Sequence, residues 1–425
     1  MPLTMNIGKI DVMLILLSGF ILFLPALSGL YFAVVFLRSP FRRVKPLPAG
    51  IPMTRFAMIV PACNEERVIQ RALDSLLRLD YPGNRMDIFV IADNCTDATA
   101  KVASSCGVHV VERFDPVRRS KQDALRWAFY DQGLLEAGYD AICIIDADTT
   151  VSPSFLRHVE RRISEGHAVV AGWRRTINPF DTFASSFSAI LTMAGNRFSE
   201  LPLVNRGISI LNYGTGVAIR CDHLRKIGWT VNTLVEDMEF ALQTILSGQK
   251  VMLCPEAVYE AEQPADIAAL WQQQRRWQSG SLSCGFLFLG KITVRFLREK
   301  DASALMGFVK LLLPYTFIAG LFQIVLGPIL SIALYGPGIF TPLSVLAGLL
   351  VAQLAGMVSA MGILLIDGSF SRKMWKGILC FSLYPVFFGM VSLVSLLWPK
   401  RNWVLIEHGL SRNRKSFLRS SSSEV

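Results

Sequence analysis

Long apolar segments near both ends of the chain enclose a more polar middle, and this distribution limits the folds open to it. Residues 12–37 carry no charge, and three further apolar stretches follow at Phe308–Leu334, Leu343–Ile366 and Ile378–Trp398. A helix needs about 20 such residues to cross a bilayer. The mean hydropathy of +0.41 is too high for an ordinary soluble enzyme. The sequence therefore predicts a membrane protein with a soluble central domain.

Basic side chains follow the first apolar segment and indicate its orientation. Arg38, Arg42, Arg43 and Lys45 lie directly after it, and basic flanks stay in the cytoplasm. The apolar run is too long for a cleaved signal peptide, which is the alternative. We therefore expect a transmembrane helix with its basic flank over residues 1–45 and a cytoplasmic middle. Three C-terminal crossings would place the basic tail, residues 401–425, outside, so either one segment is re-entrant or the tail departs from the charge rule.

The middle of the chain, residues 46–280, alternates between strand and helix patterns. Short apolar strands are predicted at Phe56–Val60, Ile88–Ala92, Val108–Val111 and Ala141–Ile145, with a helix over Ser120–Ala137. Such alternation predicts an α/β fold with a doubly wound, mostly parallel sheet. A helix is also expected over Asp266–Gly280, followed by an amphipathic interfacial helix within residues 281–304 and by membrane helices within 305–400.

Two carboxylates follow the last predicted strand of this region. Asp146 and Asp148 are separated by one residue, so in an extended segment their side chains point the same way. They would lie at the carboxyl end of the strand, where open α/β sheets bind ligands. Hard oxygen ligands suit Mg²⁺ or Mn²⁺, which often complete their coordination with substrate phosphates. A solvated turn is the simpler alternative.

Polar loops after two other strands are expected at the same edge. Pro61-Ala62-Cys63-Asn64-Glu65-Glu66 follows the first strand, with Asn64 as a candidate helix N-cap, and Asp93 to Asp97 follow the second. Their convergence with Asp146 predicts a nucleotide site. The chain contains neither a dinucleotide-binding glycine motif nor a P-loop motif.

Three later motifs are candidates for the remaining parts of a site. Gly214-Thr215-Gly216 permits close approach of the backbone to a ligand. Glu236-Asp237 opens a predicted helix, where acidic residues also complement the helix dipole. Gln273, Arg276 and Trp277 share one face of a predicted helix through their spacing.

The net charge of +10 fits contact with anionic lipid or anionic substrates. No basic run interleaved with aromatic residues appears in the middle, which argues against nucleic acid as a partner. Eight cysteines without a CxxC pair favour reduced cytosolic thiols over disulfides or zinc.

Taken in order, these motifs resemble those of family 2 glycosyltransferases. The resemblance covers roughly Ala57 to Trp277. More narrowly, the chain is similar to the membrane-embedded processive synthases of cellulose, hyaluronan, chitin oligosaccharides and poly-N-acetylglucosamine. Five features carry the likeness: the loop at Pro61–Glu65, Asp93, the DxD motif at Asp146–Asp148, the ED motif at Glu236–Asp237, and QxxRW at Gln273–Trp277. Cys63, Ala92 and Val235 depart from residues frequent in the family.

The resemblance implies a GT-A fold, a UDP-sugar donor and a divalent cation, Mg²⁺ or Mn²⁺. The implied donor-binding residues are Pro61, Ala62, Asn64, Glu65, Asp93, Lys121, Asp146 and Arg276. Asp148, with Asp146, would hold the metal. A solvated lysine in a first helical turn is the alternative for Lys121.

Catalysis is expected to rest on Asp237 as general base, with Glu236 as a helper. A single displacement would invert the anomeric centre and give a β-linked product. Gly214, Thr215, Gly216, Gln273 and Trp277 would line the acceptor path, although Trp277 could instead anchor the chain at the membrane interface.

Three functions of different classes follow from the sequence. The first is a processive synthase that extends a β-linked polysaccharide from UDP-N-acetylglucosamine or UDP-glucose and exports it, with partner export or regulatory subunits. The second is a non-processive transferase that glycosylates a lipid. The third is a non-catalytic membrane protein, which the intact Asp148 and Asp237 argue against.

Overall fold

The computed structural model describes residues 51–211, 213–336 and 341–400. The predicted N-terminal membrane helix, its basic flank and the basic tail lie outside the described residues.

The central domain is built on an eight-stranded mixed sheet with the order β3-β2-β1-β4-β7-β6-β8-β5. Four neighbouring strands are parallel: β1 (Phe56–Ala62), β2 (Met86–Asp93), β3 (His109–Arg113) and β4 (Ala141–Ile144). The other four are β5 (Thr150–Val151), β6 (Val169–Thr176), β7 (Val217–Arg220) and β8 (Val251–Ala261). Strand β7 runs antiparallel to both β4 and β6, so the sheet is less uniformly parallel than the sequence pattern predicts.

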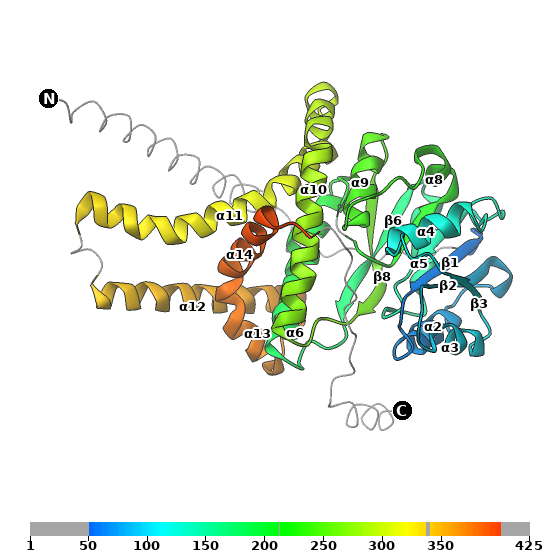
Figure 1. The fold of residues 1–425 in the computed structure, drawn as a ribbon, viewed down its shortest axis with the longest axis horizontal. Coiled ribbons are helices and arrows are strands. Elements are labelled where there is room, and N and C mark those ends of the chain that lie inside the picture. Colours follow the sequence, from blue (N-terminus) through cyan, green and yellow to red (C-terminus); the bar gives the residue numbers. More distant parts are fainter. Residues whose placement is uncertain (1–50, 212, 337–340, 401–425) are drawn as a thin grey trace.

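Helices cover both faces of the sheet (Figure 1). One face packs against α2 (Ile69–Leu77), α3 (Thr99–Ser105) and α5 (Phe155–Ser164). The opposite face packs against α4 (Lys121–Tyr130), α8 (Cys221–Ile227) and α9 (Glu236–Leu246). Strand β1 shows the alternation behind this arrangement, because Phe56 and Met58 join one core and Ala57 and Ile59 the other.

Two local predictions within this domain are wrong. Helix α4 ends at Tyr130 rather than Ala137, because the chain turns at Gly133, whose φ is +69°. Asn64 does not cap a helix: its own backbone is left-handed, with φ of 57°, and α2 begins only at Ile69. Its side-chain oxygen instead accepts a hydrogen bond from the Thr96 amide at 2.7 Å.

A helical segment between β6 and β7 packs against the apolar helices. It comprises α6 (Phe183–Ala194), one π-helical turn at Gly195–Glu200 and α7 (Leu201–Val204). Thr182 and Ser185 form a capping box at its start. A buried ion pair joins Glu200 to Lys310 of α11, and Gly377 packs against the Ser186 backbone at a spacing that admits no side chain. These contacts fix the sheet domain against the apolar helices.

Helix α10 (Ile267–Glu299) is one continuous helix across the predicted break at Gly280. Asp266 caps its start, accepting a hydrogen bond from the Ala269 amide at 2.8 Å, and Lys300 ends it in a left-handed conformation. Gly280 lies within the helix. A glycine is required there because a Cβ would come within 2.8 Å of the Val235 side chain. Here glycine serves close packing rather than helix termination.

The C-terminal part consists of apolar helices. They are α11 (Ala302–Tyr335), α12 (Pro342–Asp367), α13 (Trp375–Cys380) and α14 (Tyr384–Leu397), with 3-10 turns at Arg372–Met374 and Phe381–Leu383. Within the described residues, four helical stretches are long and apolar enough to cross a membrane: Ile267–Glu299, Ala302–Ile329, Pro342–Asp367 and Arg372–Leu397.

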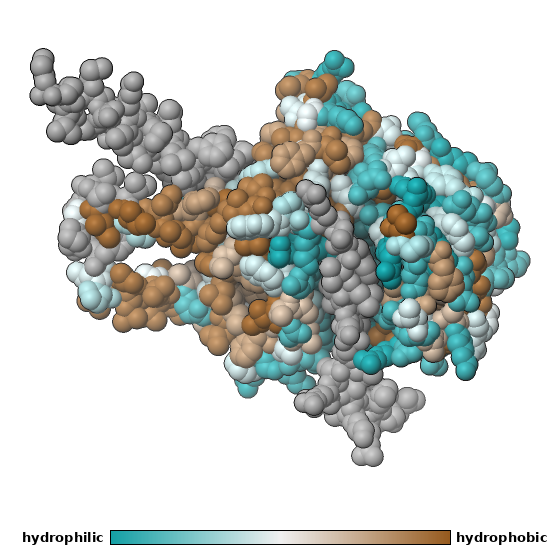
Figure 2. Space-filling model, in the orientation of Figure 1, coloured by the Kyte–Doolittle hydropathy of each residue, from teal (hydrophilic) through white to brown (hydrophobic). Residues whose placement is uncertain are grey.

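Figure 1 shows α11 and α12 projecting from one side of the molecule, with α10 lying crosswise between them and the sheet domain. Figure 2 shows hydrophobic residues gathered on α11 and α12, and hydrophilic residues gathered over the sheet domain. This division indicates that the protein associates with a membrane through the apolar end.

Candidate active site

The parallel strands β1, β2 and β4 end at one edge of the sheet, so the three loops that follow them converge there. Hydrogen bonds tie the first two loops together. Glu65 donates its amide to the Thr99 hydroxyl at 2.8 Å, and Thr96 donates its amide to Asn64. Pro61 and Ala62 form the end of β1 itself. The predicted meeting of these loops is confirmed.

Asp93, at the end of β2, has a cationic partner that the sequence pattern did not reveal. Arg113, at the end of β3, donates to Asp93 Oδ1 at 2.6 Å, and both side chains are only 6% exposed. Arg113 also bonds Asp115 at 3.0 Å and the Arg118 carbonyl at 2.8 Å. The only available signal was the position of both residues at adjacent strand ends.

Asp146 shares a lysine with the ED motif. Lys121, the first residue of α4, lies 2.6 Å from Asp146 Oδ1 and 3.1 Å from Glu236 Oε1. Burial lowers the pKa of Lys121, but the two carboxylates outweigh this effect and raise it above its ordinary value. The lysine therefore stays charged and joins the DxD loop to the start of α9.

Asp148 faces a second acidic group, Glu65. Burial, followed by the charges of Asp148 and Asp146, raises the pKa of Glu65 to about 8. Arg71 donates to the Asp148 carbonyl at 3.1 Å, and the Thr149 hydroxyl donates to Asp148 Oδ1 at 3.0 Å. Such mutual repulsion of carboxylates is relieved by a cation.

These carboxylates fit a divalent cation that shares its coordination with a ligand. In the described residues, no group of three or more His, Cys, Asp or Glu side chains is arranged to hold a metal ion by itself. Hard oxygens from Asp146 and Asp148 suit Mg²⁺ or Mn²⁺, and these ions commonly take their other ligands from water and phosphate.

Asp237 is held by the glycine-containing loop. Its Oδ2 accepts hydrogen bonds from the amides of Tyr213 at 3.2 Å and Gly214 at 2.9 Å. Burial, together with the adjacent Glu236 charge, raises the pKa of Asp237 above its ordinary value. A carboxylate with a raised pKa is a better proton acceptor, which suits a general base.

The same loop also contacts the DxD segment. Thr215 accepts a hydrogen bond from the Asp146 amide at 2.8 Å, and the Gly214 carbonyl lies 3.4 Å from Lys121 Nζ. Gly214 and Gly216 have positive φ values of 70° and 66°. Residues 213–216 thus position both Asp146 and Asp237.

A small pocket marks the point where these groups meet. Its polar lining comes from Lys121, Gly214, Glu236 and Asp237, and Trp229 contributes to its apolar wall. Lys121, Gly214, Thr215, Asp146, Glu236 and Asp237 were all predicted as site residues, and the structure brings them together.

The QxxRW residues lie on α10, which packs against α9. Gly280 contacts Val235, the residue before Glu236. Gln273 is buried, and its Oε1 has no hydrogen-bond partner among the described residues. Trp277 is partly buried against the same core as Asp237's helix. The neighbouring Arg275 donates to the Trp398 carbonyl at 2.8 Å, which joins the end of α14 to this helix.

Comparison with known proteins places the chain in a family. The model for "Glycosyltransferase like family 2" matches residues 52–280, more than half of the chain. The probable glycosyltransferase YdaM of Bacillus subtilis (strain 168) is 25% identical over 304 residues, covering 64% of this chain and 69% of that protein. A beta-monoglucosyldiacylglycerol synthase of Synechocystis sp. is 27% identical over 237 residues, covering 54% of this chain and 48% of its own length.

A solved structure shows the same fold. The mannosyltransferase from Pyrobaculum calidifontis, solved with GDP-Man and Mn²⁺, superposes with a TM-score of 0.57, at 15% identity over 91% of this chain and 98% of that one. The sheet therefore has the predicted GT-A architecture, with mixed rather than largely parallel strands. These relatives support the family but do not favour its membrane-embedded processive branch in particular. From its matched domain, its fold and its clustered carboxylates, this chain belongs to the family 2 glycosyltransferases, enzymes that transfer a sugar from a nucleotide-sugar donor to an acceptor.

Proposed function

We propose that the protein transfers one sugar from a nucleoside diphosphate sugar to a lipid acceptor at the cytoplasmic surface of a membrane. The transfer would invert the configuration at the anomeric carbon. The observation that carries this proposal is the junction of Lys121, Asp146, Glu236 and Asp237 beside α10. The monoglucosyldiacylglycerol synthases among the relatives support a lipid acceptor. The match covers only about half of the length of these relatives, so the lipid acceptor of this chain is our inference and is not taken over from their names.

Donor binding would use the edge of the sheet. Pro61, Ala62, Asn64 and Glu65 would wall the base, and Asp93 would accept a hydrogen bond from it. Because Arg113 already holds Asp93 Oδ1, the second oxygen of this carboxylate is the one available to the base.

The diphosphate would lie beside the contact between Lys121 and Asp146 of the DxD motif, with Arg276 as a further cation. Asp146 and Asp148 would hold Mg²⁺ or Mn²⁺ there, and the ion would supply Lewis-acid stabilisation of the departing diphosphate. Lys121 already stands between two carboxylates, so it would supply a fixed positive charge on the same side.

Transfer would begin with Asp237. The amides of Tyr213 and Gly214 orient its carboxylate, and this carboxylate would take the proton from the acceptor hydroxyl as the oxygen attacks the anomeric carbon. The acceptor bond forms as the bond to the diphosphate breaks, so one displacement inverts the centre. Glu236 would keep Lys121 in place, and Gly214, Thr215, Gly216, Gln273 and Trp277 would line the acceptor path.

Processive polysaccharide synthesis is the second candidate. A probable glucomannan 4-beta-mannosyltransferase of Arabidopsis thaliana, 27% identical over 293 residues, favours it. The packing of the apolar helices supports it less. Helix α11 packs mainly against α10 and α14, whereas α12 packs against α6 and α13 and exposes most of its surface. If α12 crosses the membrane, this exposed surface would meet lipid, which fits a lipid acceptor.

The test is a product assay with the purified full-length chain in micelles containing diacylglycerol. UDP-glucose, UDP-N-acetylglucosamine and GDP-mannose are supplied separately, and nucleotide release is measured with and without EDTA. We expect metal-dependent release with one donor, restored by Mn²⁺ or Mg²⁺, and a lipid carrying a single sugar. A long polymer would replace the first candidate by the second. Sugar transfer that persists in EDTA would contradict the proposed role of Asp146 and Asp148.

A further inference from the structure

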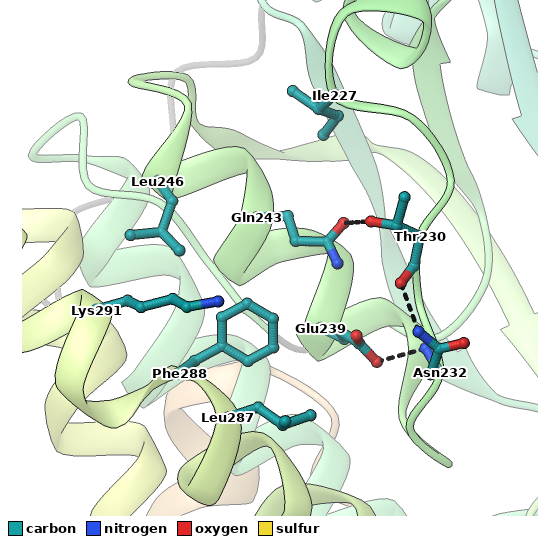
Figure 3. A pocket seen from close by; sticks show the side chains of 9 residues that line it. All are labelled: Ile227, Thr230, Asn232, Glu239, Gln243, Leu246, Leu287, Phe288 and Lys291. Atoms are coloured by element: carbon teal, nitrogen blue, oxygen red, sulfur yellow. Dashed lines mark hydrogen bonds between the residues drawn. The ribbon is translucent and has the colours of Figure 1, made fainter.

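A second pocket lies away from the carboxylates, where α9 and α10 meet the loop after α8 (Figure 3). Its volume is about 420 Å³. It is lined by Ile227, Thr230, Asn232, Glu239, Gln243, Leu246, Leu287, Phe288 and Lys291. None of these side chains has a role in the proposed sugar transfer.

The loop that forms one wall of this pocket is firmly held. Glu239 Oε2 accepts hydrogen bonds from the amides of Asn232 at 2.8 Å and Thr233 at 2.6 Å. The Thr230 hydroxyl donates to Gln243 Oε1 at 3.3 Å, as Figure 3 shows. In addition, the Arg126 side chain donates a hydrogen bond to the Val231 carbonyl at 2.9 Å. The loop wall of the pocket is therefore held in place by these contacts.

The chemistry of the pocket suits an anion with an apolar attachment. Lys291 directs its ammonium group toward the cavity, 5.4 Å from the centroid of the Phe288 ring (Figure 3). In the part of the chain that the structure describes, Lys291 forms no ion pair, and the Gln243 amide nitrogen donates no hydrogen bond. The one lining carboxylate, Glu239, is turned to the loop amides. Ile227, Leu246, Leu287 and Phe288 supply the apolar walls.

The rim of the pocket continues into an exposed apolar strip along α10. Phe286 is 78% exposed, Leu287 52%, Val294 47% and Leu297 58%. Helix α10 lies between the sheet domain and the projecting apolar helices (Figure 1). A strip of this kind on a helix in this position fits the surface of a bilayer.

We propose that this pocket binds the phosphate headgroup of an anionic phospholipid, with Lys291 and Gln243 as donors and the acyl chains along Leu287 and the exposed strip. The bound lipid would fix α10 against α9, the helix that begins with Glu236 and Asp237. The site is separate from the donor and acceptor sites and holds whether the transferase makes a glycolipid or a polymer.

The test measures binding of short-chain phospholipids to the full-length protein in detergent, with no donor present. Dihexanoyl-phosphatidylglycerol is compared with dihexanoyl-phosphatidylcholine and with inorganic phosphate. We expect the phosphatidylglycerol to bind most tightly, and Lys291→Ala to weaken it about tenfold through loss of one charge-assisted hydrogen bond. Thr230→Trp, which fills the cavity from the loop, should abolish binding.

Arg298→Ala is the matched control, because Arg298 is exposed on the same helix but does not line the pocket. It should change the affinity by no more than about twofold, as expected for an exposed charge. Equal losses in the Lys291 and Arg298 variants would show general surface attraction and overturn the proposal. So would equal affinity for both phospholipids, tighter binding of inorganic phosphate alone, or unchanged binding by Thr230→Trp. Nucleotide binding by each variant should be unchanged, which separates this result from a failure of the proposed transferase function.

Discussion

Replacing Gly216 by alanine should destabilise the loop that positions both Asp146 and Asp237. The φ of Gly216 is +66°, and a residue with a Cβ in the left-handed region costs about 1–2 kcal/mol. The new Cβ would also lie 2.5 Å from Tyr259 Cδ1. The Tyr259 ring is buried, and its hydroxyl donates to the Tyr213 carbonyl at 2.7 Å, so it cannot move without disturbing the loop. Overpacking adds about 1–3 kcal/mol.

The neighbouring Gly214 separates the two contributions. Its φ is +70°, but a Cβ there would meet nothing within 4 Å. Gly214→Ala should therefore cost only about 1–2 kcal/mol, against about 2–5 kcal/mol in total for Gly216→Ala.

Thermal unfolding of the purified chain, followed by intrinsic fluorescence, measures the difference. Gly216→Ala should lower the Tm on the order of 10 °C and Gly214→Ala clearly less. Since Thr215 holds the Asp146 amide, Gly216→Ala should also lower kcat. Equal losses of Tm in the two variants would refute the assigned contact with Tyr259.

Three further predictions concern the charged groups of the site. Lys121→Met should raise the KM for the nucleotide sugar about tenfold or more, because a buried charged hydrogen-bond donor is lost; steady-state kinetics would measure this, and an unchanged KM would contradict the diphosphate role. Arg113→Met should destabilise the domain by about 3–5 kcal/mol, since it leaves the buried Asp93 carboxylate without its partner. Thermal unfolding would detect that loss, and Arg113→Lys should recover part of it; a wild-type Tm in Arg113→Met would argue against the pair. Because Asp237 acts when ionised and its pKa is raised, kcat/KM should increase with pH through a limb above the ordinary carboxylate range. Glu236→Gln removes a neighbouring charge that raises this pKa, so its limb should shift to lower pH; a shift to higher pH would exclude the assigned electrostatics.

The strand pattern was sufficient to predict the edge where the site forms. Apolar runs ending in Pro61, Asp93 and Asp146 predicted parallel strands and convergent loops, because in parallel neighbours the carboxyl ends share one edge. The spacing of Gln273 and Trp277 likewise predicted a common helix, which the structure contains. These features depend on local periodicity.

The features that could not be predicted depend on contacts between distant parts of the chain. Arg113 neutralises Asp93 across two strands, and nothing within either segment indicates that pairing. In the sequence, Gly280 indicates a helix end, yet in the structure it packs closely against Val235, which precedes α9 in a distant part of the chain. The roles of individual residues followed from the family resemblance, because a role depends on the bound substrate as well as on local sequence.

The most direct test of the account is the behaviour of Asp237→Asn. This substitution keeps the size of the side chain but removes its capacity to accept a proton. Binding of the nucleotide and of the nucleotide sugar, measured by calorimetry, should stay close to that of the unchanged protein, while kcat should fall by about 10²–10⁴-fold. Retained turnover would contradict the assignment of Asp237 as the base, and with it the claim that the junction of Lys121, Asp146, Glu236 and Asp237 performs the sugar transfer.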